Sequence, residues 1–425
     1  MDRLSRPGGR GRRASLCGAL LILAAAGGCR ERAQAVQSEA ELKDMVHRMM
    51  PLVAQATGLP FKHEPTVLRR SRAQVRDYVI HKFDEDLPPN ELAGLQASLR
   101  LFGLIPDSLQ LRSTMIDLLT EQIAGYYDPD SNALYIPADI EPFQLRVVVS
   151  HELVHALQDQ YVKLDSIITQ RRRNDRRSAA QAILEGQATV AQIPVLMPEQ
   201  KPDTFPVGWF WKQRAVMAQQ QARMQEFSKA PVWLREGLVF PYLAGADFII
   251  WYRRKYFDES VIDPAHMPHS TEQILHPDRY AAKDEPTELV FTGNRVDTVQ
   301  YEDNLGEFET RLLFQQHLNN ETEAAQLAEG WDGDRYEVLG PKADVLVWYS
   351  VWDDAAAATR FTKGLERAWA KRRSAGAGAD RRSEVKQLTI DGRPVVRLVD
   401  APASWKGWSG GGGGLPTVRL SGPGE

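Results

Sequence analysis

His151-Glu152-Leu153-Val154-His155 is the stretch on which the interpretation of this chain depends. In a helix of 3.6 residues per turn, residues four apart lie on one face, so both imidazoles project the same way with Glu152 beside them. Zinc prefers tetrahedral nitrogen, oxygen or sulfur ligands, and a hydrolytic zinc site keeps one position for water. The stretch therefore predicts two metal ligands and a neighbouring proton acceptor, and it requires a third protein ligand from elsewhere in the chain.

The residues around this motif are apolar on nearly every side, from Phe143 through Leu157. Such a run is typical of a buried helix, for which Asp139 is the expected N-cap and Pro142 lies in the first turn. Histidines in a helix are often only hydrogen-bonded core residues. A buried helix with three polar groups on one face must satisfy them, however, and a bound metal ion satisfies them together.

A candidate third ligand, Glu185, lies thirty residues beyond His155 in a predicted helix over residues 178–188. An unpaired carboxylate among these apolar and small residues would be costly. Gly186 costs a helix about 1 kcal/mol relative to alanine, so its presence with Ala188 predicts the close approach of another helix. The alternative is a glutamate that faces solvent. We expect Glu185 to point at the two histidines.

These two motifs together resemble those of the gluzincin, or thermolysin-like, metallopeptidases. The chain is also similar to uncharacterised bacterial proteins, often lipoproteins, which share the G-Y-Y-D-P stretch at 125–129 and the S-T-E-Q-I-L-H-P stretch at 270–277. The resemblance spans residues 59–336 and implies a zincin-like catalytic domain. It assigns His151, His155 and Glu185 as ligands of Zn²⁺ and Glu152 as the general base.

The same resemblance assigns a supporting residue. Asp159 lies four residues beyond His155 on the same face, and it matches the position that orients a ligand histidine in the thermolysin group. The chain departs from the family pattern at Thr189, where an aspartate usually follows the ligand glutamate by four residues. The groups that hold the ligand histidines must therefore differ here.

A peptidase also needs a donor for the negative oxygen that develops during hydrolysis, and metallopeptidases usually use a histidine or tyrosine. His276 is our first candidate because it ends the polar 270–277 segment. Tyr242 and Tyr280 are the alternatives. Each of the three is equally compatible with a structural role.

Two short aromatic and β-branched runs, 122–127 and 133–136, flank a cluster of Asp, Pro and Asn residues. They predict a β-hairpin directly before the active-site helix. In zinc peptidases of this kind the strand before the helix is commonly an edge against which an extended substrate pairs. A purely structural hairpin explains the pattern equally well.

The N-terminus predicts export. Arginines precede an apolar run from Leu16 to Ala26 that is too short to span a bilayer, which is typical of a secretory signal. Ala26-Gly27-Gly28-Cys29 resembles a bacterial lipobox, so we expect Cys29 to be lipidated and to anchor the protein in the cell envelope.

Composition excludes several other functions. The chain has two cysteines, at 17 and 29, so the expected mature protein has no disulfide, no zinc–thiolate site and no cysteine nucleophile. Removal of residues 1–28 takes away five arginines and one aspartate, which changes the formal net charge from −4 to −8. This balance gives no support to nucleic-acid binding.

The chain as a whole predicts an α+β protein that is predominantly helical. All-helical packing is expected before Gln122, a helix over 209–227 and another over 240–252, and a tight polar loop at 330–336. A strand at 343–352, a helix at 355–370 and a hairpin over 385–399 predict a small C-terminal β-α-β-β unit. The expected division is a signal peptide (1–28), a tether (29–38), the catalytic domain (39–337), a small α/β satellite (338–405) and a flexible tail (406–425).

The sequence thus predicts an exported, membrane-tethered zinc peptidase that cleaves peptides or proteins of the cell envelope. The alternative is a catalytically silent zinc-binding lipoprotein with a binding or scaffolding role. The presence of Glu152 favours the peptidase, because a purely structural zinc site has no use for a carboxylate that is not a ligand. Cleavage specificity is not predicted, since the residues that form a specificity pocket lie on segments that the sequence does not place.

Overall fold

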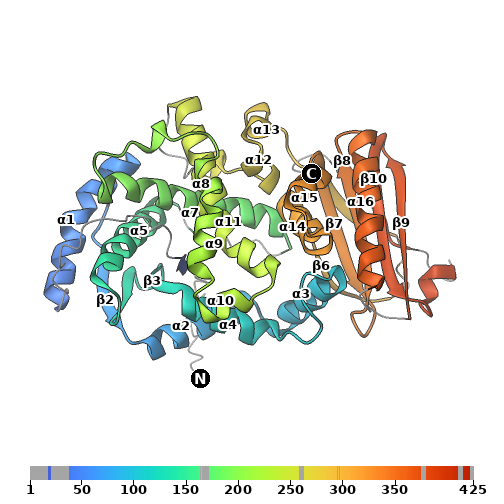
Figure 1. Cartoon of the computed structure of the whole chain (residues 1–425), viewed down its shortest axis with the longest axis horizontal. Coiled ribbons are helices and arrows are strands. Elements are labelled where there is room, and N and C mark those ends of the chain that lie inside the picture. Colours follow the sequence, from blue (N-terminus) through green and yellow to red (C-terminus); the bar gives the residue numbers. More distant parts are fainter. Residues whose placement is uncertain are drawn as a thin grey trace, which may run out of the picture.

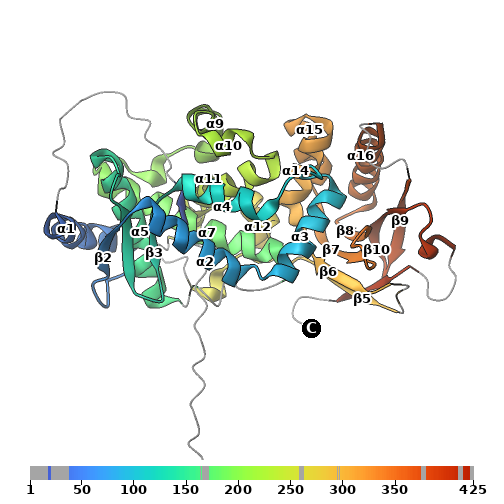
Figure 2. The same ribbon diagram turned by 90° about the horizontal axis from the view of Figure 1, so that it is seen from below.

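The chain has a mostly helical N-terminal region and an antiparallel sheet in its C-terminal region, so the predicted α+β class is confirmed (Figure 1). In this computed structural model, α1 and β9 lie at opposite ends of an elongated molecule in both views (Figures 1 and 2). The structure describes the backbone of residues 18–20 and residues 38–162, 164, 172–257, 263–293, 295, 297–374, 380–409 and 415–421. The predicted lipidation site Cys29 and most of the predicted signal and tether lie outside the described residues.

The helices predicted around residues 143–157, 178–188, 240–252 and 355–370 are present, and those at 178–188 and 240–252 extend four to eight residues beyond each predicted end. None of the described helices is long and apolar enough to cross a bilayer. The helices of the N-terminal region are α1 (Glu39–Thr57), α2 (Arg72–Asp86), α3 (Pro89–Phe102), α4 (Leu111–Gln122), α5 (Pro142–Tyr161), α7 (Asn174–Leu196), α8 (Trp209–Lys212), α9 (Arg214–Gln221), α10 (Gln225–Lys229), α11 (Val232–Tyr256), α12 (Thr271–Leu275) and α13 (Pro277–Ala282).

Two helix predictions were wrong in detail. The N-cap of α5 is Glu141, and Asp139 instead forms an ion pair with Arg72 at 3.0 Å. The helix expected over 209–227 is broken into α8, α9 and α10. Asp247 of α11 accepts hydrogen bonds from the backbone N–H groups of Phe210 and Trp211, which fixes the first of these short helices against α11.

The predicted hairpin is confirmed as β3 (Ile123–Asp128) and β4 (Ala133–Pro137), an antiparallel pair. It belongs to a four-stranded sheet with the order β1-β3-β4-β2, where β1 is Gly18–Leu20 and β2 is Thr66–Arg70. The expectation of all-helical packing before residue 122 was therefore wrong, because β2 pairs in parallel with β4. The strand directly before α5 is β4, which is interior, and β3 lies between β4 and β1, so neither strand of the hairpin is an edge of the described sheet.

The C-terminal region is built on a five-stranded antiparallel sheet with the order β6-β7-β8-β10-β9. The predicted β-α-β-β unit is confirmed as β8, α16, β9 and β10. The sheet also contains β6, which precedes residue 338, and β7, which runs across that position, and the domain division there stays a prediction. The elements are β5 (Glu288–Thr292), β6 (Val299–Asp303), α14 (Gly306–Leu318), α15 (Glu321–Ala328), β7 (Trp331–Leu339), β8 (Val345–Trp352), α16 (Ala355–Ser374), β9 (Arg381–Ile390), β10 (Arg393–Pro402) and β11 (Thr417–Ser421).

The loop predicted at 330–336 was wrong, because these residues form most of β7. The error came from its aspartates, which are buried instead of exposed. Asp334 accepts hydrogen bonds from the backbone N–H groups of Leu305 and Gly306 and from the indole N–H groups of Trp331 and Trp348. A buried carboxylate that is fully supplied with donors is tolerated in a strand.

The C-terminal stretch was also predicted wrongly as a tail without structure. Within residues 406–425, β11 pairs antiparallel with β5 over Thr417–Ser421. Val418 is buried in this pair, and its alternation with exposed neighbours is the period of a half-buried strand. Residues 410–414 lie outside the described part of the chain.

Helices α7 and α11 make the closest helix contact near the middle of the molecule. A Cβ atom on Gly186 would lie 2.2 Å from the backbone carbon of Gly245, and one on Gly245 would lie 1.9 Å from the carbonyl oxygen of Ala182. Only glycine allows two backbones to approach this closely. The close helix approach expected at Gly186 is therefore confirmed.

Replacing Gly186 with alanine should destabilise the protein by about 1–3 kcal/mol, because the added methyl group overpacks the contact. The matched control is Gly237→Ala on α11, where a Cβ atom would meet nothing within 4 Å. That change should be neutral or stabilising by up to about 1 kcal/mol, as expected for alanine in a helix. Denaturant unfolding of both variants measures the difference, and equal stabilities would contradict the importance of the glycine contact.

Candidate metal centre

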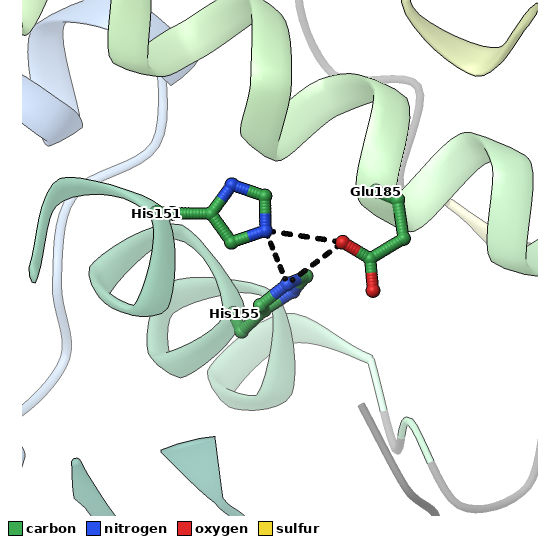
Figure 3. Close-up of side chains that lie close together, drawn as sticks. All are labelled: His151, His155 and Glu185. Carbon is green, nitrogen blue, oxygen red and sulfur yellow. Dashed lines mark hydrogen bonds and ion pairs between the residues drawn. The ribbon is translucent and has the colours of Figure 1, made fainter. Parts of the chain in front are cut away.

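Three buried side chains from two helices converge on one point (Figure 3). His151 and His155 come from α5, and Glu185 comes from α7. His151 Nε2 lies 3.0 Å from Glu185 Oε2, His155 Nε2 lies 3.3 Å from the same oxygen, and the two Nε2 atoms are 3.2 Å apart. The predicted convergence of Glu185 on both histidines is thus present in the structure.

These distances fit a metal ion. Zinc–nitrogen and zinc–oxygen bonds of about 2.0–2.1 Å at tetrahedral angles place neighbouring ligand atoms about 3.3 Å apart. The three atoms have nearly that spacing, and two imidazoles with one carboxylate are donors that zinc accepts. The group can therefore hold a divalent metal ion, with one tetrahedral position left for a non-protein ligand.

The protonation of the group, considered without a metal ion, supports the same conclusion. Burial disfavours charge on His155, but Glu185 outweighs burial and raises the pKa of His155 to about 9. Burial would raise the pKa of Glu185, yet the charge of His155 and the hydrogen bonds from both histidines lower it to about 2. The carboxylate thus needs a positive partner in this buried place, and a metal cation supplies that charge when it displaces the proton.

Gln158 holds His155 from behind. The Oε1 atom of Gln158 lies 2.8 Å from Nδ1 of His155, so the histidine turns Nε2 toward the centre. The amide nitrogen of Gln158 donates to the carbonyl oxygen of Leu184 and to Gln187 on α7. One side chain thereby fixes a ligand histidine and ties α5 to the turn of α7 that carries Glu185.

A second glutamine stands beside the other histidine. Gln192 of α7 is buried. Its side-chain carbonyl oxygen has no hydrogen-bond partner among the described residues, and its side chain interacts with the imidazole of His151. Thr189, at the position where the resemblance implies an aspartate, is also buried, and its hydroxyl makes no hydrogen bond among the described residues. The supporting groups of this centre are therefore amides, which sequence reasoning missed because glutamine gives no metal-site signal of its own.

Asp159, the supporting residue implied by the resemblance, lies beside a different group. Its Oδ2 atom accepts a hydrogen bond of 3.0 Å from the hydroxyl of Tyr127 on β3. The same hydroxyl oxygen lies 3.1 Å from Oδ1 of Asn132 in the hairpin turn. Asp159 therefore links α5 to the hairpin, and Gln158 is the residue that hydrogen-bonds to Nδ1 of His155.

Glu152 directly follows His151 on α5, is fully buried, and interacts electrostatically with His155 and Glu185. Its Oε2 atom accepts a hydrogen bond of 2.8 Å from the backbone N–H of Tyr127, and Oε1 has no hydrogen-bond partner among the described residues. Burial raises the pKa of Glu152 to about 8, although the Tyr127 N–H opposes this. One oxygen is thus fixed and the other is available to exchange a proton.

The three candidates for the oxyanion donor lie in different surroundings. Tyr242 of α11 is buried, and its ring stacks at 5.9 Å on the ring of His151. His276 contacts Glu307 at 2.9 Å and Arg311 at 3.0 Å on α14. Tyr280 donates its hydroxyl proton to the carbonyl oxygen of His266. Among the contacts described for the three, that of Tyr242 with His151 reaches the candidate metal centre. Tyr242 therefore replaces His276 as our first candidate for the oxyanion donor.

Comparisons with known proteins match part of the chain to a family model and assign no activity. Residues 294–404 match a family described as "Domain of unknown function (DUF8575)", which covers the C-terminal sheet and leaves the metal centre outside. No curated protein matches the chain.

One solved structure, from Chloroflexus aurantiacus and described as a candidate hydrolase with a novel fold, is 19% identical with a TM-score of 0.37. The similarity covers 60% of this chain and 93% of that one. At these values the likeness supports neither a fold nor a function. The zincin-like fold expected from the motifs accordingly stays a proposal, which depends on the site itself.

Loss of the Gln158 hydrogen bonds should weaken metal binding. We expect Gln158→Leu to bind zinc about 10–100-fold less tightly, because a second-shell partner orients the ligand histidine. Gln160→Leu is the matched control, since Gln160 lies on the same helix but bonds to the backbone of Lys62 and His63 at the surface. Competition with a chromophoric chelator measures both affinities, and unchanged affinity in folded Gln158→Leu would contradict the assignment.

Proposed function

We propose that this protein is a zinc-dependent peptidase, with His151, His155 and Glu185 as metal ligands and Glu152 as the general base. The observation that carries the proposal is the buried group of three donor atoms 3.0–3.3 Å apart with a second, non-ligand carboxylate beside it. A metal held only for stability has no need of that second carboxylate. A hydrolytic metal site does need one, because a proton must leave water during attack.

A bound zinc ion would polarise the scissile carbonyl and lower the pKa of a water molecule. Glu152 would accept the proton of that water as its oxygen bonds to the carbonyl carbon. The same carboxyl group would then give the proton to the amine nitrogen as the C–N bond breaks. In the absence of a metal ion, burial raises the pKa of Glu152, and the same burial would favour retention of the proton between the two steps.

The developing negative oxygen also needs a donor from the protein. We assign this role to Tyr242, because its ring contacts His151 while His276 pairs with Glu307. A Tyr242→Phe variant keeps the ring packing and removes only the hydroxyl, so its kinetic effect reports on the hydroxyl alone.

Peptides are the favoured substrate class because removal of the proposed signal peptide, which contains β1, would leave β3 with a free edge next to Glu152. The backbone of Gly18–Leu20 pairs antiparallel with this edge, with Gly18 opposite Tyr126 and Leu20 opposite Ile123. An extended chain is therefore accepted along β3, and addition of a strand to a free edge is a common mode of peptide recognition. Tyr127, the next residue, donates its N–H to Glu152, so a chain on this edge passes beside the proposed base.

The decisive variant is Glu152→Gln. It should bind zinc like the wild type but cleave peptides about 10²–10⁴-fold more slowly, because it cannot accept a proton. A chelator should abolish wild-type cleavage, and added zinc should restore it. Mass spectrometry of an unbiased peptide library, with metal analysis of each sample, measures both properties.

The control for this experiment is Glu199→Gln, the same change at an exposed position, which should leave cleavage unaltered. Zinc-loaded wild type that cleaves no peptide would favour the silent zinc-binding lipoprotein instead. Full activity of Glu152→Gln would rule out Glu152 as the base while leaving the metal site intact.

We propose further that the protein is exported and lipid-anchored to the bacterial cell envelope at Cys29. This proposal comes from the sequence of residues 1–29 and from no structural observation. Detergent partitioning tests it: the wild type should enter the detergent phase, and Cys29→Ala should stay in the aqueous phase. A Cys29→Ala protein that still partitions into detergent would contradict the lipid anchor.

A further inference from the structure

Four arginines line one small hollow in the C-terminal region, where α16 and β9 lie side by side (Figure 1). Arg372 and Arg373 lie in the last turn of α16, and Arg381 and Arg382 are the first two residues of β9. The remaining lining residues of this arginine hollow are Trp369, Ser383 and Asp400. Four positive groups in the lining therefore face the single carboxylate of Asp400.

The two inner arginines are held by Asp400. Arg372 donates from Nη1 to Oδ2 of this carboxylate at 3.2 Å, and Arg381 donates from Nε to Oδ1 at 2.7 Å. Asp400 is itself buried, and it also accepts a hydrogen bond from the indole N–H of Trp369. One negative charge thus fixes two guanidinium groups and neutralises only one of them. Burial lowers the pKa of Arg372, and the nearby charge of Arg381 lowers it further, although Asp400 opposes both effects.

The two outer arginines are exposed and keep most of their charge available. Arg373 donates to the hydroxyl of Ser383, and no carboxylate of the described residues lies within ion-pair distance of it. Arg382 lies 3.8 Å from Glu384, whose other oxygen already accepts a hydrogen bond of 2.6 Å from Arg397. The outer pair therefore adds positive charge to a place where the inner pair already exceeds its carboxylate.

The end of a helix does not account for this cluster. Basic residues are favoured in a last helical turn, because the carbonyl groups there carry partial negative charge. This preference explains Arg372 and Arg373 but not Arg381 and Arg382, which belong to a strand. Asp380, the residue before that strand, is exposed, and water screens its charge. The convergence of the two pairs thus points to a negative group that is not part of the lining.

The size of the hollow limits that group. Its volume is about 10 Å³, roughly the space that one water molecule needs. A whole side chain does not fit, but one oxygen of an anion does, and the other oxygens would lie at the exposed Arg373 and Arg382. The planar N–H pairs of guanidinium groups match the oxygens of phosphate and carboxylate. A phosphate monoester carries about −1.5 to −2 charge at pH 7, so it balances the excess of positive charge better than a carboxylate does.

We propose that the arginine hollow binds a phosphate group, carried either by a free phosphate ion or by an anionic lipid headgroup. Arg372 and Arg381, fixed by Asp400, would receive one phosphate oxygen, and Arg373 and Arg382 would bind the others. The site shares no residue with the candidate metal centre. It therefore does not depend on the peptidase function proposed above.

Calorimetry with inorganic phosphate and vesicle flotation test this proposal in the full chain. The chain carries Cys29→Ala, so that the proposed lipid anchor cannot cause vesicle binding. The vesicles contain phosphatidylcholine alone or phosphatidylcholine with phosphatidic acid, whose headgroup is a phosphate monoester. We expect this chain to bind phosphate or the phosphatidic acid vesicles. The double change Arg373→Gln with Arg382→Gln should weaken that binding about 10–100-fold, because two charged donors are lost.

The matched control is Lys363→Gln with Lys386→Gln. These lysines are exposed on α16 and β9 and lie outside the lining, so the same loss of charge should leave binding unaltered. Thermal unfolding checks that both double variants are folded. Binding of phosphate without vesicles identifies the free ion as the ligand, and binding only to vesicles with phosphatidic acid identifies the headgroup.

Four results would overturn the proposal. The first is that neither probe binds, and the second is that binding survives in the folded variant without Arg373 and Arg382. The third is an equal loss in the lysine control, which would show general attraction by surface charge. The fourth is binding of acetate as tight as that of phosphate, which would make the hollow a carboxylate site.

Discussion

The close contact between α7 and α11 is the constraint on which the metal centre depends. Gly186 and Gly245 let the two backbones meet at distances that any Cβ atom would prevent. Glu185 is the neighbour of Gly186, so its position is set by this contact on one side and by the Gln158 bond to Leu184 on the other. A buried carboxylate placed in this way cannot turn to solvent, and it must be neutralised where it stands. The two histidines of α5 do so, and they leave room for a metal cation that could take over this role.

The sequence predicted this candidate centre because its residues either follow a local spacing rule or would destabilise a buried helix without a tertiary partner. The spacing of His151 and His155 places them on one helix face regardless of the remaining fold. Glu185 and Gly186 are each unfavourable in a buried helix unless tertiary structure compensates, so their adjacency indicated a contact between elements. Gln158 and Gln192 gave no such signal, because an amide is acceptable at the surface and in the core alike.

The failures in the rest of the fold have a related cause. Asp332 and Asp334 indicated a loop, yet both are buried in β7, where distant residues supply their hydrogen bonds. β2 contains two arginines in five residues and was missed, since its parallel pairing with β4 depends on a partner more than sixty positions away. Local composition does not reveal whether a residue distant in the sequence will supply a hydrogen bond or a pairing strand. The errors therefore lie where long-range pairing overrides local preference.

The hydrogen bond from Tyr127 to Glu152 has a consequence for alignment along β3. An exposed edge strand normally offers its outward N–H groups to whatever chain pairs with it. Here one of those donors is already committed to a side chain of α5. The pairing of β1 with β3 is irregular on this edge, between Gly18 and Leu20. A peptide bound along β3 as proposed would therefore lack one backbone hydrogen bond beside the Glu152 carboxylate, and this missing bond would fix which residue of the peptide lies there.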